Sequence, residues 1–164
     1  MLTWQDVIND KSLQDLPYKI ELNRYGKVEM SPASNRHVIV QGELLHLIKM
    51  RLPGGVTIPE CSVQTSAGVK VPDVAWCSYR FFEAQGTQTP FPVAPEICVE
   101  VVSPSNSNVE MIEKAALYFA TGALEVWLVD LDGNIEFHGP EGRRAQSSFA
   151  EFPLKLDLFY LKKH

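Results

Sequence analysis

The sequence predicts an α/β fold in which helices pack against a mixed β-sheet. Residues 96–130 contain a strand, a helix and a second strand, with the order and lengths of a right-handed parallel crossover. Before and after this unit, short apolar and β-branched runs are separated by turn residues, which is typical of antiparallel strands. A sheet with both kinds of pairing, covered by helices, is the architecture that buries these elements together.

Helix ends are indicated by capping residues and by apolar spacing. Thr3 and Asp6 resemble a capping box, with Asp in place of Glu or Gln. Ser34 or Asn35 precedes apolar residues at roughly helical spacing, and Gly122 follows the last helical run. These signals predict helical segments at residues 3–13, 34–52, 78–84 (a single turn) and 107–120.

Strands are indicated by extended apolar runs bounded by Gly, Pro and Asn. The first two runs flank the turn at 23–26 and predict a hairpin that Pro32 ends. Later runs lie on either side of "LPGG" and "LDGN", which read as turns. The expected strands are residues 18–23, 27–31, 56–59, 61–65, 69–76, 96–102, 124–130 and 135–140, with weaker pieces at 143–149 and 154–159.

The size and composition indicate one domain over residues 1–164. Hydrophobic residues make up 45% of the chain and charged residues 21%, which suits a packed globular core. No apolar run approaches the length of a membrane helix, and the N-terminus lacks the pattern of a signal peptide. The three cysteines are widely spaced and odd in number, so we expect them to be buried free thiols. We therefore expect the protein to be cytoplasmic.

The charge balance argues against an overtly basic nucleic-acid-binding protein. The formal net charge is −5, whereas DNA-binding domains usually carry a basic footprint. A local cluster can still bind DNA within an acidic whole. Basic residues of the hairpin and the first long helix form either such a patch or a solvated face: Arg24, Lys27, Arg36, Lys49 and Arg51.

Two acidic residues stand within otherwise apolar strands. Asp73 lies in "KVPDVAWC" and Glu100 in "EICVEVVS". A buried carboxylate is costly unless it is paired, and neighbouring side chains of a strand point to opposite faces. If the two strands lie side by side, both carboxylates converge, and such hard oxygen ligands suit Mg²⁺.

Each of these residues also has an ordinary structural interpretation. Glu100 could pair with a buried arginine or lysine, and Asp73 could serve as a turn residue after Pro72. Lys114 follows Glu110 by four residues on the predicted helix 107–120, so the two could form an exposed ion pair. Lys114 also borders the apolar stripe of that helix, from where it could lean toward the sheet.

Four segments carry a resemblance to a known bacterial family. "VEMSPASNRH", "VPDVAW", "PEICVEVVSPSNS" and "EKAALYFATGALEVWLVD" resemble the Uma-two family of putative restriction endonucleases, in the same order and over about residues 18–138. This family belongs to the PD-(D/E)xK nucleases. The resemblance implies a restriction endonuclease-like mixed central sheet flanked by helices, with a divalent-metal site at one end.

The resemblance also implies roles for individual residues. Asp73 matches the first acid of the nuclease signature and Glu100 the second, which makes them the ligands of Mg²⁺ or Mn²⁺. The signature lysine would stand at position 102, which is Val102 here, and Lys114 matches a lysine relocated to the following helix. The implied reaction is hydrolysis of phosphodiester bonds, in which a metal polarises the phosphate and activates water.

Two further residues match family positions. Glu29 matches an earlier acid that would complete the site, and His37 matches a position for which a helix-start or packing histidine is the competing interpretation. The implied partner is DNA, and no association with a membrane is expected. A homodimer would suit cutting of both DNA strands. The alternative function is a degenerate, non-catalytic member that binds nucleic acid or protein, which the acidic charge and Val102 favour.

Overall fold

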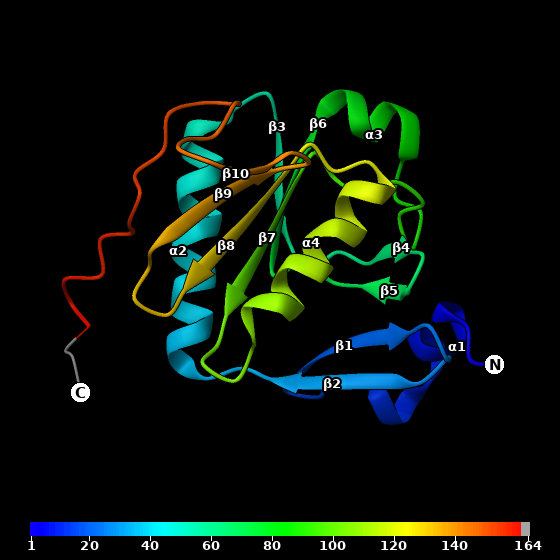
Figure 1. Ribbon diagram of the computed structural model, residues 1–164. Coiled ribbons are helices and arrows are strands. Elements are labelled where there is room, and N and C mark those ends of the chain that lie inside the picture. Colours follow the sequence, from blue (N-terminus) through cyan, green and yellow to red (C-terminus); the bar gives the residue numbers. More distant parts are fainter. Residues whose placement is uncertain (162–164) are drawn as a thin grey trace.

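The computed structural model describes residues 1–161, which form helices, two β-sheets and a C-terminal segment without regular structure (Figure 1). The helices are α1 (Trp4–Asn9), the 3₁₀ helix η1 (Lys11–Leu13), α2 (Asn35–Arg51), α3 (Tyr79–Gln85) and α4 (Asn108–Thr121). The strands are β1 (Tyr18–Asn23), β2 (Val28–Pro32), β3 (Gly55–Pro59), β4 (Val63–Thr65), β5 (Gly68–Lys70), β6 (Val74–Ser78), β7 (Ile97–Val102), β8 (Glu125–Asp130), β9 (Ile135–Gly139) and β10 (Gly142–Arg144).

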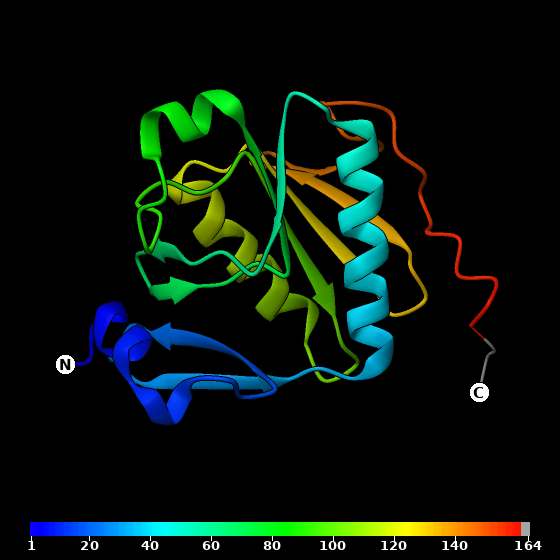
Figure 2. The ribbon, with the colours of Figure 1, turned by 180° about the vertical axis from the view of Figure 1, so that it is seen from behind.

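The larger sheet has six strands in the order β10-β9-β8-β7-β6-β3. Strands β7 and β8 are parallel and joined by α4, while the other pairs in this sheet are antiparallel. The predicted parallel crossover within a mixed sheet is therefore confirmed. Figures 1 and 2 show α2 and α4 on opposite faces of the sheet, which they cover from both sides.

Strand β7 divides its side chains between these two faces. Ile97, Val99 and Val101 pack in one core with Val40, Leu44 and Ile48 of α2. Cys98 lies in the other core, with Met111, Ala115 and Tyr118 of α4. Since strand side chains alternate, Glu100 shares the α4 face with Cys98 and Val102, as the sequence predicted.

The smaller sheet has four strands in the order β2-β1-β5-β4 and carries the predicted hairpin at one side. Leu22 of β1 packs with Val69, Val71 and two residues of α1, Trp4 and Val7. The hairpin lies beneath the larger sheet in the view of Figure 1. The remaining face of β1, which carries Lys19 and Glu21, is thereby left for contacts with the larger sheet.

The predicted helix ends match the capping residues of the structure. Thr3 and Asp6 form the expected capping box, and Ser34 caps α2 through the backbone N–H of His37. Ser107 and Glu110 form a second box at the start of α4, and Gly122 ends that helix with a φ of 117°. The left-handed conformation at this position favours glycine, because a Cβ would be strained there.

Three predicted segments differ from the structure. The expected helix 3–13 is interrupted at Asp10, whose side chain caps η1 instead. The expected strand 69–76 is divided at Pro72 into β5 and β6, which belong to different sheets. Proline has no backbone N–H to donate to a ladder, so the chain can change sheets there. Two weaker strands were expected at residues 143–149 and 154–159. In the described part of the chain, these regions form only β10 and an isolated bridge between Asn134 and Lys155.

The basic residues proposed as one patch do not gather on one surface. The turn of the β1–β2 hairpin and the C-terminal end of α2 lie at opposite corners of the molecule in Figure 1. On α2, Arg36 donates to the Leu131 carbonyl at 2.7 Å and Arg51 to the Glu151 carbonyl at 3.0 Å, so both hold neighbouring segments. Over residues 1–161, no helix is long and apolar enough to cross a membrane.

Candidate active site

Asp73 and Glu100 face each other across two paired strands. In the antiparallel pair of β6 and β7, Val74 lies opposite Val99, and the next step of this register places Asp73 opposite Glu100. Directly opposed residues of an antiparallel pair point to the same face. Both side chains are almost fully buried, with exposures of 1% and 2%. The convergence that the sequence predicted is therefore present.

Asp73 is held by neighbours on both of its carboxylate oxygens. The backbone N–H of Val101 donates to Oδ2 at 2.7 Å, and His37 Nε2 lies 3.3 Å from Oδ1. Gln41 donates to the backbone carbonyl of Asp73 at 2.8 Å. Burial alone would raise the pKa of Asp73, but the His37 contact, the charge of Lys19 and the Val101 N–H outweigh it and hold this pKa well below its usual range.

Glu100 is surrounded by three donors. Tyr118 donates its hydroxyl to Oε1 at 2.7 Å, Lys114 lies 3.0 Å from the same oxygen, and Lys19 lies 3.1 Å from Oε2. Burial raises the pKa of Glu100 above its usual value, although the charges of Lys114 and Lys19 act in the opposite direction. Burial and the nearby carboxylates raise the pKa of Tyr118 well above its usual value, so its phenol stays protonated and donates.

Lys114 points into this cluster, as its position beside the apolar stripe of α4 predicted. Its ammonium lies 2.8 Å from Glu21 Oε1 as well as 3.0 Å from Glu100 Oε1. Glu110, the alternative partner on the same helix, instead accepts from the backbone N–H of Ser107 in the capping box. The interpretation of Lys114 and Glu110 as an exposed surface pair is therefore wrong.

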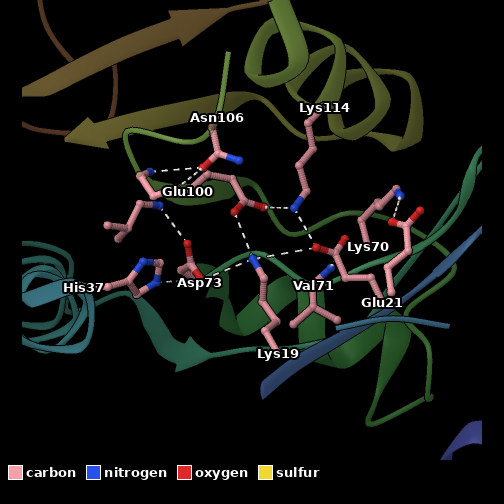
Figure 3. A network of polar contacts seen from close by, with 12 residues as sticks. Lys19, Glu21, His37, Lys70, Val71, Asp73, Glu100, Asn106 and Lys114 are labelled. Carbon is pink, nitrogen blue, oxygen red and sulfur yellow. Dashed lines mark hydrogen bonds and ion pairs between the residues drawn. The ribbon is translucent and has the colours of Figure 1, made fainter. Parts of the chain in front are cut away.

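Lys19 and Glu21, which the sequence did not single out, complete the cluster from β1 (Figure 3). The Lys19 ammonium lies 3.2 Å from Asp73 Oδ1 and 3.1 Å from Glu100 Oε2, and 3.7 Å from Glu21 Oε1. Glu21 also accepts from the Val71 N–H at 3.2 Å. Burial would lower the pKa of Lys19, but the three carboxylates outweigh it and raise this pKa well above its usual value.

The alternation in "YKIELN" is the one signal that could have identified these residues. Lys19 and Glu21 share a face of β1, while Ile20 and Leu22 point to the small core beside α1. A strand with one polar face normally turns that face to water. Only the docking of the hairpin onto the larger sheet buries it, and nothing local in the sequence encodes that docking.

Glu29 lies outside the cluster that the other candidates form. Its carboxylate accepts from Asn23 at 3.0 Å and lies 3.8 Å from Lys70, and its side chain is half exposed. Glu29 pairs with Glu21 across β1 and β2, so the strand partner of the predicted acid is the one that reaches the cluster. A catalytic role of Glu29 stays a prediction, and Glu21 is the better-placed third acid.

The cluster forms the floor of an open pocket of about 670 Å³. Lys19, Glu21, Asp73, Glu100 and Lys114 line it together with His37 and Gln41 of α2. The loop between β7 and α4 and the end of the hairpin form the rim through Ser103, Ser105, Asn106, Met30 and Ser31. The two buried acids therefore lie in the lining of an open pocket.

The donor set of the pocket fits a hard cation. Within residues 1–161, no group of three or more His, Cys, Asp or Glu side chains is arranged as a complete metal-ligand set. Mg²⁺, however, needs only one or two protein carboxylates, because it keeps several waters. Asp73 Oδ1 and Glu100 Oε2 already converge on one cationic group, the Lys19 ammonium. These two carboxylates are the residues that could hold the metal.

The chain is similar to known proteins in sequence and in fold. The sequence model of the Uma2 family, described as "Putative restriction endonuclease", matches residues 10–157. A crystal structure of a putative nuclease belonging to DUF820, from Anabaena variabilis ATCC 29413, superposes with a TM-score of 0.67 at 17% identity, over 86% of this chain and 81% of that one. The restriction endonuclease-like fold is therefore confirmed. None of the curated proteins compared with the chain matches it.

Proposed function

Because the chain belongs to the Uma2 family of putative restriction endonucleases, we propose that it is a Mg²⁺- or Mn²⁺-dependent endonuclease that hydrolyses phosphodiester bonds in DNA. The observation that carries this proposal is the convergence of Asp73 and Glu100 across β6 and β7 at the floor of an open pocket. Two lysines reach the same point, one from α4 and one from β1. Acids and lysines gathered in this way suit hydrolysis of a phosphate ester.

The metal in this proposal is held by Asp73 and Glu100. When bound, a divalent ion polarises the phosphate and lowers the pKa of an attacking water. The formal charges of the cluster leave room for a dication, because three acids, Glu21, Asp73 and Glu100, stand against two lysines, Lys19 and Lys114. One dication and one phosphodiester anion, added together, would bring this cluster to neutrality.

The protein's own residues supply positioning and charge in this proposal. Lys114 offsets negative charge that develops on the phosphate, and it is fixed for this by Glu21 at 2.8 Å and Glu100 at 3.0 Å. His37, 3.3 Å from Asp73 Oδ1, and the Val101 N–H orient the Asp73 carboxylate. Tyr118, which is buried in the core, orients the Glu100 carboxylate by donating its hydroxyl to it.

We also propose that the protein acts in the bacterial cytoplasm. The three cysteines are free, and Cys77 and Cys98 are buried, which suits a reducing bacterial cytoplasm. A homodimer would place two sites on one duplex and allow cutting of both strands. Sedimentation of the protein with and without a DNA duplex would test the dimer, and a monomer under both conditions would contradict it.

A non-catalytic member of the family is the second candidate. Val102 stands where the nuclease signature has its lysine, and the Lys19 ammonium already pairs with both acids. Acids that are paired with lysines in this way could serve only to stabilise the fold. Such a protein would bind nucleic acid or a partner without cleaving it.

Nicking of supercoiled plasmid separates the two candidates. We expect wild-type protein to nick plasmid with Mg²⁺ or Mn²⁺ and not with EDTA, and Asp73→Asn to lose this activity while keeping its circular dichroism spectrum. Asp157→Asn is the matched control, because Asp157 is exposed on the C-terminal segment and lies outside the pocket. A wild-type protein that shifts DNA on a gel but nicks it under no metal condition would establish the non-catalytic function instead.

A further inference from the structure

Lys19 occupies the point at which the acids of the pocket converge. Its ammonium lies 3.2 Å from Asp73, 3.1 Å from Glu100 and 3.7 Å from Glu21, while its side chain is 12% exposed. Among residues 1–161, Lys114, the other lysine of the cluster, forms ion pairs with Glu21 and Glu100 and none with Asp73. Lys19 is therefore the lysine that bridges both predicted metal ligands (Figure 3).

Lys19 holds one oxygen of each acid, and His37 Nε2 also lies 3.3 Å from the Asp73 oxygen, Oδ1. Asp73 Oδ2 accepts from the Val101 N–H, and Glu100 Oε1 accepts from Tyr118 and Lys114. Asp73 Oδ1 and Glu100 Oε2 face the Lys19 ammonium. These are the two oxygens that already converge on one cationic group, so a metal that binds both carboxylates there would compete with Lys19.

We propose that Lys19 is a built-in counter-ion that a divalent metal displaces, so that its ammonium holds Asp73 and Glu100 together without metal and moves into the pocket toward the substrate phosphate with metal. This inference rests on the proposed function and adds a residue to it. Two carboxylates at one point repel each other unless a cation intervenes, and Lys19 provides that cation in the protein alone. The site is thus preorganised for a metal without the cost of unpaired acids.

The position of Lys19 allows the movement. Lys19 lies on the face of β1 that points to the pocket, opposite Ser31 of β2, and both residues line the pocket. A lysine carries its ammonium on a flexible four-carbon stem, so the charge can shift while the strand stays in place. The displaced ammonium would still lie within the pocket, where an incoming phosphodiester needs positive charge.

Calorimetric titration with Mn²⁺ tests the competition directly. We expect Lys19→Met to bind Mn²⁺ with a Kd at least about tenfold lower than wild type, which corresponds to about 1.4 kcal/mol, because the metal no longer has to displace an ammonium. Lys49→Met is the matched control, since Lys49 is exposed on α2 outside the pocket, and its Kd should equal that of wild type. If Lys19→Met binds Mn²⁺ as wild type does, or more weakly, Lys19 does not compete with the metal.

The same titration separates failure of this inference from failure of the proposed function. Wild type that binds Mn²⁺, with an unchanged Kd in Lys19→Met, overturns only the role of Lys19. If neither protein binds Mn²⁺, the metal-dependent function and the inference both fall. If Lys19→Met alone binds, Lys19 is confirmed as the competing cation and the wild-type protein is not a metal enzyme.

A measurement on wild-type protein keeps the inference testable if Lys19→Met does not fold. Lysine acetylation by acetic anhydride, mapped by mass spectrometry, reports which amines are free. We expect Lys19 to react slowly without metal, because its ammonium is paired with two carboxylates, and several-fold faster with saturating Mg²⁺. Lys49 should react equally in both conditions. A Lys19 that reacts no faster with Mg²⁺ would contradict displacement.

Discussion

Deletion of the Tyr118 hydroxyl measures how strongly the protein core supports the acid at position 100. Tyr118 is fully buried on α4 and donates to Glu100 Oε1 at 2.7 Å. Tyr118→Phe removes this donor and leaves the ring, so packing against Ala115 and Cys98 is retained. The carboxylate then keeps Lys114, at 3.0 Å, as the remaining partner of that oxygen.

The expected loss follows from the charge and burial of this contact. A hydrogen bond to a charged group contributes about 1.5–3 kcal/mol, and since Lys114 remains, we expect Tyr118→Phe to lower the free energy of unfolding by roughly 2 kcal/mol. For a chain of this length, that corresponds to a Tm decrease of about 4–8 °C. Urea denaturation and calorimetry at pH 7 would measure both quantities.

The chain provides a matched control for this substitution. Tyr160 donates its hydroxyl to Glu43 Oε1 at 2.8 Å, so the chemical change in Tyr160→Phe is the same. Tyr160 is exposed, and water can replace its hydroxyl, so the Tm should stay within the error of measurement. If Tyr118→Phe changed the Tm as little as Tyr160→Phe does, the argument that Glu100 depends on buried donors would be refuted.

The remaining predictions concern the acids and lysines of the pocket. Because the pKa of Asp73 is lowered in the folded protein, its stabilising contribution is present above about pH 4, its ordinary value, and is lost as the pH falls toward the lowered folded value. The stability difference between wild type and Asp73→Asn should therefore shrink below pH 4 in urea titrations, and a constant difference from pH 7 to pH 2 would contradict the shift. Lys114→Met should lower the rate of plasmid nicking at least about tenfold, because the site loses one positive charge that stabilises the transition state. An unchanged rate of nicking would show that Lys114 has no catalytic role. Val102→Lys in the Lys114→Met background should restore part of this activity, because position 102 shares the face of Glu100; an absence of any recovery in gel assays would show that the ammonium must come from α4.

The acids of the site could be predicted from the sequence because the prediction needed only strand geometry. Asp73 and Glu100 each interrupt an apolar run, and the period of two places Glu100 on the face away from Val99 and Val101. Side-by-side pairing of the two strands then suffices to bring the carboxylates together. The helical spacing in α4 placed Lys114 in the same way.

Lys19 and Glu21 could not be predicted because their position depends on contacts far along the chain. Lys19 lies 54 residues from Asp73 and 81 residues from Glu100 in sequence. The predicted acid of this hairpin, Glu29, stands opposite Glu21 on the neighbouring strand, and local pattern does not distinguish two acids on one face of a hairpin. The docking of β1 decides between them.

The division of the expected strand 69–76 has the same origin. Its residues are continuously strand-like, yet β5 pairs with β1 in one sheet and β6 with β3 and β7 in the other. Which of two sheets a short strand joins is fixed by long-range pairing. The proline at position 72 marks the change only in retrospect.

The hairpin that carries Lys19 and Glu21 forms one wall of the pocket. Strands β1 and β2 belong to the smaller sheet and do not pair with strands of the larger one. The hairpin is connected to Asp73 and Glu100 by the ion pairs of Lys19. A local opening that moved this wall away would separate Lys19 from Asp73 and Glu100. Separation of the hairpin from the larger sheet would therefore also take apart the cluster of acids and lysines.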